Sequence, residues 1–113
     1  MKIILEDSAK NCLDDIYYYN YLFSLRNAKE TDRDIRLFVQ ILETWPYLGR
    51  FISKISNKNF RELIRAQNKR SYRIIYFISE TTNTIHIIYI ANSKRDFTQF
   101  LKLNNYFKNF SIF

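Results

Sequence analysis

The second half of the chain carries three apolar segments, each separated from the next by only four residues. The segments span 60–66, 71–79 and 84–91, are rich in Ile, Tyr and Phe, and are joined by turns at 67–70 and 80–83. Runs of this composition between polar turns are typical of β-strands. Connections this short can join only antiparallel neighbours. The sequence therefore predicts a three-stranded antiparallel meander.

The first half shows one short strand followed by helical periodicity. We expect a strand over residues 2–6, a first helix capped by Ser8 that ends near residues 25–28, and a second helix capped by Thr31 or Asp32. Pro46 stops the second helix, and Trp45 is expected to anchor it to the sheet. The residues at helical spacing are Ala9, Cys12, Leu13, Ile16, Asn20 and Phe23 in the first helix, and Ile35, Phe38, Leu42 and Trp45 in the second.

The order of these elements predicts the fold class. Two helices with a short join form an αα-hairpin. A strand, this hairpin and then the meander give an α+β fold with one mostly antiparallel sheet. The run of tyrosines at 17–21 covers all sides of the first helix, so some of them must be exposed. Packing within the hairpin is the expected role of these tyrosines, and contact with a partner is the alternative.

Length and composition limit the chain to one ordered domain. It has 113 residues, 47% of them hydrophobic, with one glycine and one proline, which excludes a disordered or low-complexity protein. We expect the domain to span residues 1–103, and the apolar extension at 104–113 to dock on it. A short helix is expected within the domain at 97–103.

Few classes of site remain open. A single cysteine and a single histidine leave no disulfide framework and no metal site, so we expect no cofactor and a reducing, cytoplasmic location. The first residues turn acidic too early for a signal peptide, and no apolar run is long enough to cross a membrane.

The charge is unevenly distributed along the sequence. Residues 1–34 hold five basic and seven acidic residues, whereas residues 35–113 hold thirteen basic and four acidic residues. Charge kept for solubility alone has no reason to segregate in this way. The basic part is expected to form a surface that meets phosphates or an acidic partner.

Arginines dominate the sheet region. We expect an antiparallel meander to bring Arg61, Arg65 and Arg73 near one surface, joined there by Arg95 from just after the last strand, with Lys94 beside it. The planar guanidinium suits bidentate contact with phosphate or carboxylate. The alternative for each arginine is a solvated strand position or an ion pair with Glu62, Glu80 or Asp96.

An ordered set of short motifs resembles the RelE/ParE superfamily, the toxins of type II toxin–antitoxin modules. The set covers residues 1–103 and follows the family's order and spacing. It comprises the strand–helix–helix opening, the turn WPYLGR at 45–50, FREL at 60–63, SYRIIY at 71–76 and KRDF at 94–97. Members of this superfamily inhibit growth and stabilise plasmids, so the resemblance implies a basic, growth-inhibiting toxin.

Two activities occur on the fold that the resemblance implies. RelE-like members cut messenger RNA at the ribosome without a metal, and ParE-like members trap DNA gyrase on cleaved DNA without being nucleases. For a ribonuclease, the resemblance places Arg73 and Arg95 as phosphate-gripping residues, with Lys54 and Lys58 as loose matches to catalytic lysines. Leu101 stands where a catalytic tyrosine is expected, so Tyr106 is the nearest substitute. His86 lies within a strand, where structural roles are commoner.

The missing acid–base group and the long hairpin favour ParE-like inhibition of gyrase. The alternatives are a RelE-like messenger RNA endoribonuclease, and a degenerate, non-toxic subunit that only binds its antitoxin. All three imply a cognate antitoxin whose acidic segment covers the basic residues. The residues expected to contact this partner or nucleic acid are Lys54, Lys58, Arg61, Arg65, Arg73, Lys94 and Arg95.

Overall fold

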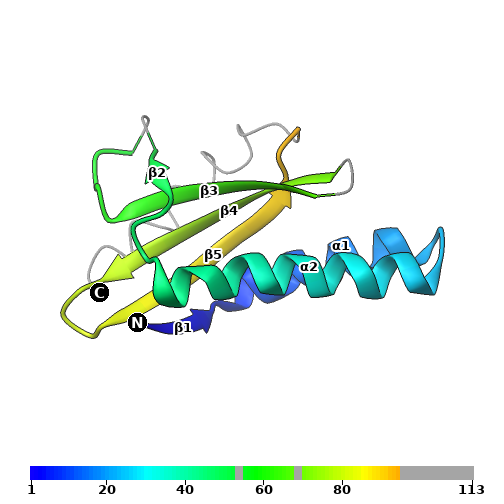
Figure 1. Cartoon of the computed structure of the whole chain (residues 1–113), viewed down its shortest axis with the longest axis horizontal. Coiled ribbons are helices and arrows are strands. Elements are labelled where there is room, and N and C mark those ends of the chain that lie inside the picture. Colours follow the sequence, from blue (N-terminus) through cyan, green and yellow to red (C-terminus); the bar gives the residue numbers. More distant parts are fainter. Residues whose placement is uncertain (53–54, 68–69, 95–113) are drawn as a thin grey trace.

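The computed structural model describes residues 1–52, 55–67 and 70–94. Figure 1 shows two helices lying along one face of a single sheet, which confirms the predicted α+β fold class. In chain order the elements are β1 (Lys2–Leu5), α1 (Asp7–Tyr21), α2 (Leu25–Thr44), β2 (Arg50–Phe51), β3 (Phe60–Gln67), β4 (Arg70–Ser79) and β5 (Thr84–Asn92).

The sheet has the strand order β1-β5-β4-β3-β2. The three predicted strands β3, β4 and β5 are confirmed to within one residue at each end and form an antiparallel meander. Asn83 closes the turn between β4 and β5 with a φ of 54°, a left-handed conformation that asparagine tolerates. β1 pairs with β5 in parallel, and the two-residue β2, which the sequence did not predict, pairs with β3.

The start of α1 differs from the prediction. The N-cap position is Glu6, and its side chain makes no capping hydrogen bond, so the assignment of Ser8 as the cap is wrong. The Ser8 hydroxyl instead donates to the carbonyl oxygen of Ile88 in β5 at 2.6 Å. Ser8 therefore ties the first turn of α1 to the sheet.

The join between the helices also differs. α1 ends at Tyr21 and α2 already begins at Leu25, so the predicted end of the first helix near 25–28 and the predicted cap at Thr31 or Asp32 are wrong. Ser24 caps α2 by accepting a hydrogen bond from the Asn27 amide at 2.9 Å. The polar residues that follow Leu25 belong to the first turns of α2, where Arg26 and Glu30 pair at 2.9 Å.

The main core lies between the helices and one face of the sheet. We call this the helix face. Apolar residues of both helices pack there on alternate residues of the strands, because successive strand side chains point to opposite faces. The buried members are Ala9, Leu13, Ile35, Phe38, Val39, Leu42, Leu63, Tyr72, Ile74, Tyr76, Ile78, Ile85, Ile87 and Ile90.

A second, smaller cluster lies on the opposite face of the sheet, which we call the far face. Its buried members are Ile52, Phe60, Ile75, Phe77 and Ile88. A register shift opposite Ile75 and Tyr76 inserts Ile88 as an extra residue in β5. The bulge explains why Ile87 and Ile90 join the main core although three positions separate them.

Tyr76, in the central strand β4, holds the turn that follows α2. Its side chain is fully buried, and its hydroxyl donates to the Pro46 carbonyl and accepts from the Gly49 amide, both at 2.8 Å. A Cβ atom on Gly49 would lie 2.5 Å from the Tyr76 hydroxyl, so no larger residue fits without a shift. Trp45 is 64% exposed, and its predicted role as an anchor is wrong, because the chain has already left the helical conformation there.

Several predictions fall on other parts of the chain. Arg95, the expected helix at 97–103, Tyr106 and the docking of 104–113 lie outside the described residues, as does Lys54. The division into a domain at 1–103 and an extension at 104–113 stays a prediction.

Replacing Tyr76 with Phe should lower the free energy of unfolding by about 1 to 3 kcal/mol, because the Gly49 amide and the Pro46 carbonyl then lose a buried partner. Urea denaturation measures the change. Tyr18→Phe is the matched control, since Tyr18 is 65% exposed and should change stability little. Equal stability of the two variants would contradict the role given to the hydroxyl.

Alkaline pH should weaken the fold through the same residue. Burial raises the pKa of Tyr76 and also that of Tyr72. A raised phenol pKa gives stability that is fully present below the unfolded value of about 10 and is lost as pH rises through the folded value. Urea midpoints measured across this range should therefore fall less steeply for Tyr76→Phe than for the parent chain. Parallel curves would contradict the prediction.

Candidate functional site

Arg61 in β3 is held between two aromatic rings. Its guanidinium carbon lies 4.4 Å from the ring centre of Phe51 in β2 and 5.1 Å from that of Tyr47. Its Nη1 donates to the carbonyl oxygens of Gly49 at 2.9 Å and Tyr47 at 3.3 Å. Arg61 therefore fixes the loop between α2 and β2. Part of its guanidinium group is already used in these hydrogen bonds and ring contacts.

Two further cations, Lys58 and Arg65, lie near Arg61 and its aromatic neighbours. Lys58 is exposed, and its Nζ lies 5.7 Å from the centre of the Phe51 ring. Arg65, one alternate position along β3 from Leu63, is exposed and lies 5.7 Å above the Phe38 ring of α2. Lys58, Arg61 and Arg65 thus form a line of positive charge from the loop before β3 to the edge of α2.

Arg73 lies elsewhere, beside a buried carboxylate. The Glu62 side chain is 9% exposed, and it accepts from Arg50 Nε at 2.6 Å and faces Arg73 Nε at 3.4 Å. The side chain of Arg73 is only 18% exposed. The ion pair with Glu62, which the sequence left open as an alternative, is present.

The strand register divides the arginines between the two faces of the sheet. Arg61 and Arg65 pair across the strands with Tyr76 and Tyr72, which belong to the helix face. Arg73 pairs with Ile64 and lies on the far face, with Ile75 and Phe77. The prediction that Arg61, Arg65 and Arg73 share one surface is therefore wrong. The register pairs Arg73 with Ile64, whose side chain points to the opposite face from those of Arg61 and Arg65.

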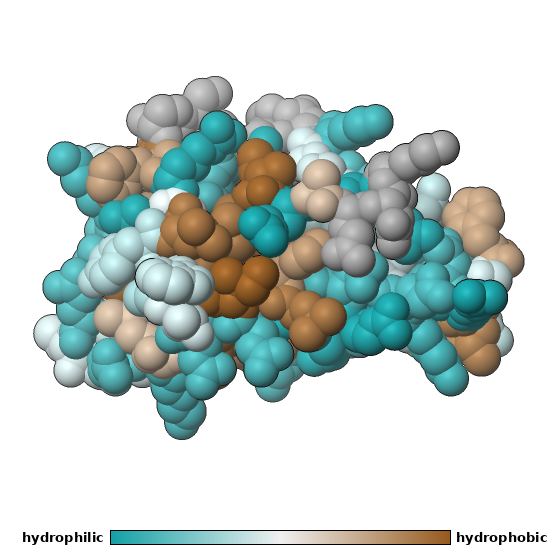
Figure 2. Space-filling model, viewed as in Figure 1, coloured by the Kyte–Doolittle hydropathy of each residue, from teal (hydrophilic) through white to brown (hydrophobic). Residues whose placement is uncertain are grey.

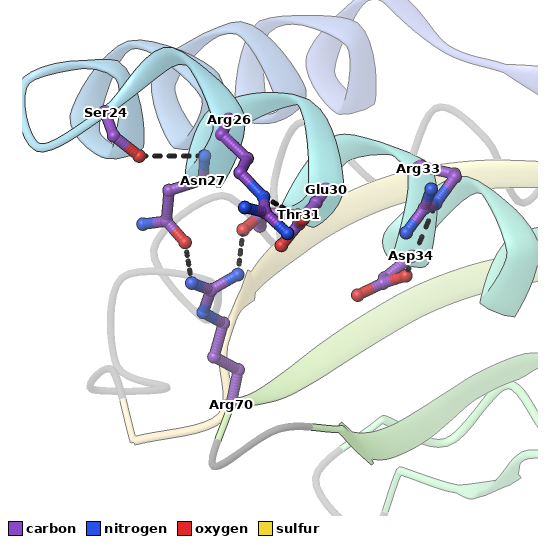
Figure 3. A network of polar contacts seen from close by, with 8 residues as sticks. All are labelled: Ser24, Arg26, Asn27, Glu30, Thr31, Arg33, Asp34 and Arg70. Atoms are coloured by element: carbon purple, nitrogen blue, oxygen red, sulfur yellow. Dashed lines mark hydrogen bonds and ion pairs between the residues drawn. The ribbon is translucent and has the colours of Figure 1, made fainter.

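Sequence reasoning missed Arg70, which was assigned to a turn. Figure 3 shows its guanidinium reaching from the first residue of β4 to Asn27 and Thr31 of α2, with which it forms hydrogen bonds. Arg70 therefore joins the hairpin to the sheet. It also lines a cleft of about 590 Å³ between α1 and the ends of β4 and β5, as does Lys94. The uncharged Asn and Thr partners gave no signal for this contact in the sequence.

The remaining candidates have structural surroundings. His86 is buried in β5, and its Nδ1 lies 2.6 Å from a carboxylate oxygen of Glu6. Within residues 1–52, 55–67 and 70–94, no group of three acidic, cysteine or histidine side chains is placed to bind a metal ion. No helix in that part of the chain is long and apolar enough to cross a membrane.

A helical hairpin on one face of a sheet, with β1 parallel to β5 and a meander rich in arginine, is the arrangement of RelE/ParE superfamily toxins. The model of one family, described as the ParE toxin of type II toxin-antitoxin system, parDE, matches residues 3–97. The chain therefore belongs to the ParE toxin family. A search of curated proteins found no match.

Family membership establishes two coarse functional facts. The chain is the toxin of a type II toxin–antitoxin system, and its partner is a cognate antitoxin. The roles of the individual cations in contact with that partner or with a target stay predictions.

Replacing Glu62 with Gln should destabilise the protein by about 1 to 3 kcal/mol, because a neutral amide then stands between two guanidinium groups. Thermal or urea unfolding measures the loss. Glu43→Gln is the matched control, because Glu43 is exposed on α2 and should change stability by less than about 0.5 kcal/mol. Unchanged stability in Glu62→Gln would mean that Arg73 does not depend on this carboxylate.

Proposed function

We propose that the chain inhibits DNA gyrase, trapping it on cleaved DNA as ParE-like toxins do, and does not cut messenger RNA itself. The proposal is finer than family membership, which gives only a toxin with an antitoxin. One observation carries it, namely the separation of Arg73 from Arg61 and Arg65 by the strand register.

A ribonuclease needs cations that converge on one phosphate, because the transition state gathers negative charge there. Arg73, the phosphate-gripping position by resemblance, has the Glu62 carboxylate 3.4 Å away. That carboxylate, which Arg50 also contacts at 2.6 Å, offsets part of the positive charge there and would repel a phosphate brought beside it. Arg61 and Arg65 lie on the other face, and Arg50, which shares Glu62 with Arg73, is itself paired with that carboxylate at 2.6 Å.

The surface around Arg61 supports contact with a protein. Aromatic residues and arginine are enriched at protein interfaces, whereas lysine is more often found at their rims. Tyr47 and Phe51 are about half exposed on either side of the Arg61 guanidinium, and Lys58 lies at the margin. We propose that this surface, with Arg65, meets the target protein or the acidic segment of the antitoxin. Lys54, Lys94 and Arg95 remain candidates for the same contacts.

The purified chain should inhibit supercoiling by DNA gyrase and accumulate cleaved DNA, and it should leave translated messages uncut. A supercoiling assay with isolated gyrase and primer extension on messages from induced cells measure the two activities separately. Induction should also raise the DNA-damage response, since the broken DNA persists.

Charge reversal in Arg65→Glu tests the proposed surface, because Arg65 is exposed and should tolerate the change with little loss of stability. Weaker gyrase inhibition is expected. The matched control is Lys29→Glu, which reverses an exposed charge on α2. Codon-phased cuts in translated messages with normal supercoiling would contradict the proposal and favour the RelE-like ribonuclease. Normal growth with a folded chain would favour the non-toxic, antitoxin-binding subunit.

A further inference from the structure

The far face of the sheet is buried, although neither helix packs on it. Ile75 and Ile88 are fully buried there, and Phe77 is almost so. His86 is also buried on this face, since it pairs with Phe77 across the strands and the two rings lie 6.3 Å apart. These side chains are buried in the single chain, so the layer that covers them belongs to the chain itself.

The described residues supply only part of that layer. Both helices lie on the helix face (Figure 1). Within residues 1–52, 55–67 and 70–94, the apolar residues from outside β3, β4 and β5 that pack in the far-face cluster are Ile52 and Ile55. Both follow β2 at the edge of the sheet, whereas Ile88 lies in β5, about 10 Å across the strands from β3. Two side chains at one edge do not cover three strands.

The sequence beyond Lys94, which we call the tail, has the pattern of a covering segment. Residues 95–113 include nine large apolar or aromatic side chains among nineteen residues. Five of them follow the i, i+3, i+4, i+7 spacing that places side chains on one face of a helix, and the residues between them are mostly Asn, Lys and Ser. This tail stripe consists of Leu103, Tyr106, Phe107, Phe110 and Phe113.

We propose that the tail stripe packs on the far face of the sheet and forms the layer opposite the helical hairpin. An amphipathic helix has to bury its apolar stripe, and an apolar sheet face needs a second layer. The chain is long enough for this arrangement. His86 lies six residues before Asn92, or about 20 Å along β5, whereas the eleven residues from Asn92 to Leu103 can extend to about 36 Å.

The burial of other surfaces favours the far face as the place where the tail packs. Leu37 on α2 and Leu48 before β2 are about half exposed in the single chain, and Figure 2 shows apolar side chains of this kind in the middle of the visible surface. The cleft beside Tyr19 and Tyr72 keeps a volume of about 590 Å³. A tail packed at either place would fill or bury it, whereas the far face is already buried.

The same arrangement bears on two residues of the sequence-based site. Arg73 lies on the far face, so the tail would limit the access of a phosphate to its guanidinium. Tyr106 belongs to the tail stripe, so its ring would face the sheet. Arg61 and Arg65, which lie on the helix face, would stay open to an acidic partner. The packing of the tail does not rest on the choice of gyrase as the target.

Paramagnetic relaxation tests where the tail lies. A nitroxide label is attached to the variant C12S/N109C of the full chain, made by cell-free synthesis, because Asn109 is on the polar side of the predicted tail helix. We expect the label to broaden the backbone amide signals of β3, β4 and β5 most strongly, and those of α2 least. Strongest broadening in α1 or α2, or no broadening within residues 1–94, would overturn the proposal.

The chain's one histidine reports the cover chemically. The double variant F107S/F110S should raise the rate at which diethyl pyrocarbonate modifies His86 by about tenfold or more, because a weakened cover opens more often. Mass spectrometry locates and quantifies the modification, and circular dichroism checks that the sheet is retained. The matched control is Ile112→Ser, which removes an apolar side chain from the opposite side of the predicted tail helix and should leave the rate unchanged.

An unchanged rate in a folded F107S/F110S chain would overturn the proposal, as would an equal increase in Ile112→Ser. If the double variant does not fold, the labelled chain decides the question, because it keeps the whole stripe. Neither measurement involves gyrase, so failure of the proposed function would leave both results as they stand.

Discussion

The buried hydroxyl of Tyr76 is the constraint on which the rest of the candidate site depends. A phenol in the centre of a core must find hydrogen-bond partners, and the turn at 46–49 supplies them through the Pro46 carbonyl and the Gly49 amide. The turn then presents the carbonyl of Gly49 to Arg61. β2 begins at the next residue, and its Arg50 contacts Glu62 on the far face. The Tyr76 hydroxyl therefore helps to position side chains on both faces of the sheet.

The arginines of this fold differ in the contacts they make as well as in their position. Arg70 joins the hairpin to the sheet, Arg73 shares a buried carboxylate with Arg50, and Arg61 stacks between rings. Arg65 and Lys58 are exposed, as is Arg50 beside Glu62. A basic composition therefore overstates the number of charges available to an antitoxin or a target, because several arginines are used within the fold.

The fold was more predictable than the site. The meander could be predicted from its short turns, since a four-residue connection can join only neighbouring antiparallel strands. The helix join was misplaced because residues 26–30 look like a loop, whereas Ser24 caps a helix that includes them. The prediction of the site was wrong because the strand register was not known. Alternation within a strand can be read from sequence, but the pairing of Ile64 with Arg73 cannot, and it decides which arginines share a face.

The parallel pairing of β1 with β5 determines when the molecule can be completed during synthesis. Residues Lys2–Leu5 are made before the other described strands, yet their partners Thr84–Ile87 belong to β5, the last of the described strands. Until then the hairpin has no sheet to cover, and its apolar stripes stay exposed on the nascent chain. Long sequence separation of this kind slows folding. The sheet can therefore be completed only once β5 has been made, and β1 stays without its partner strand until that point.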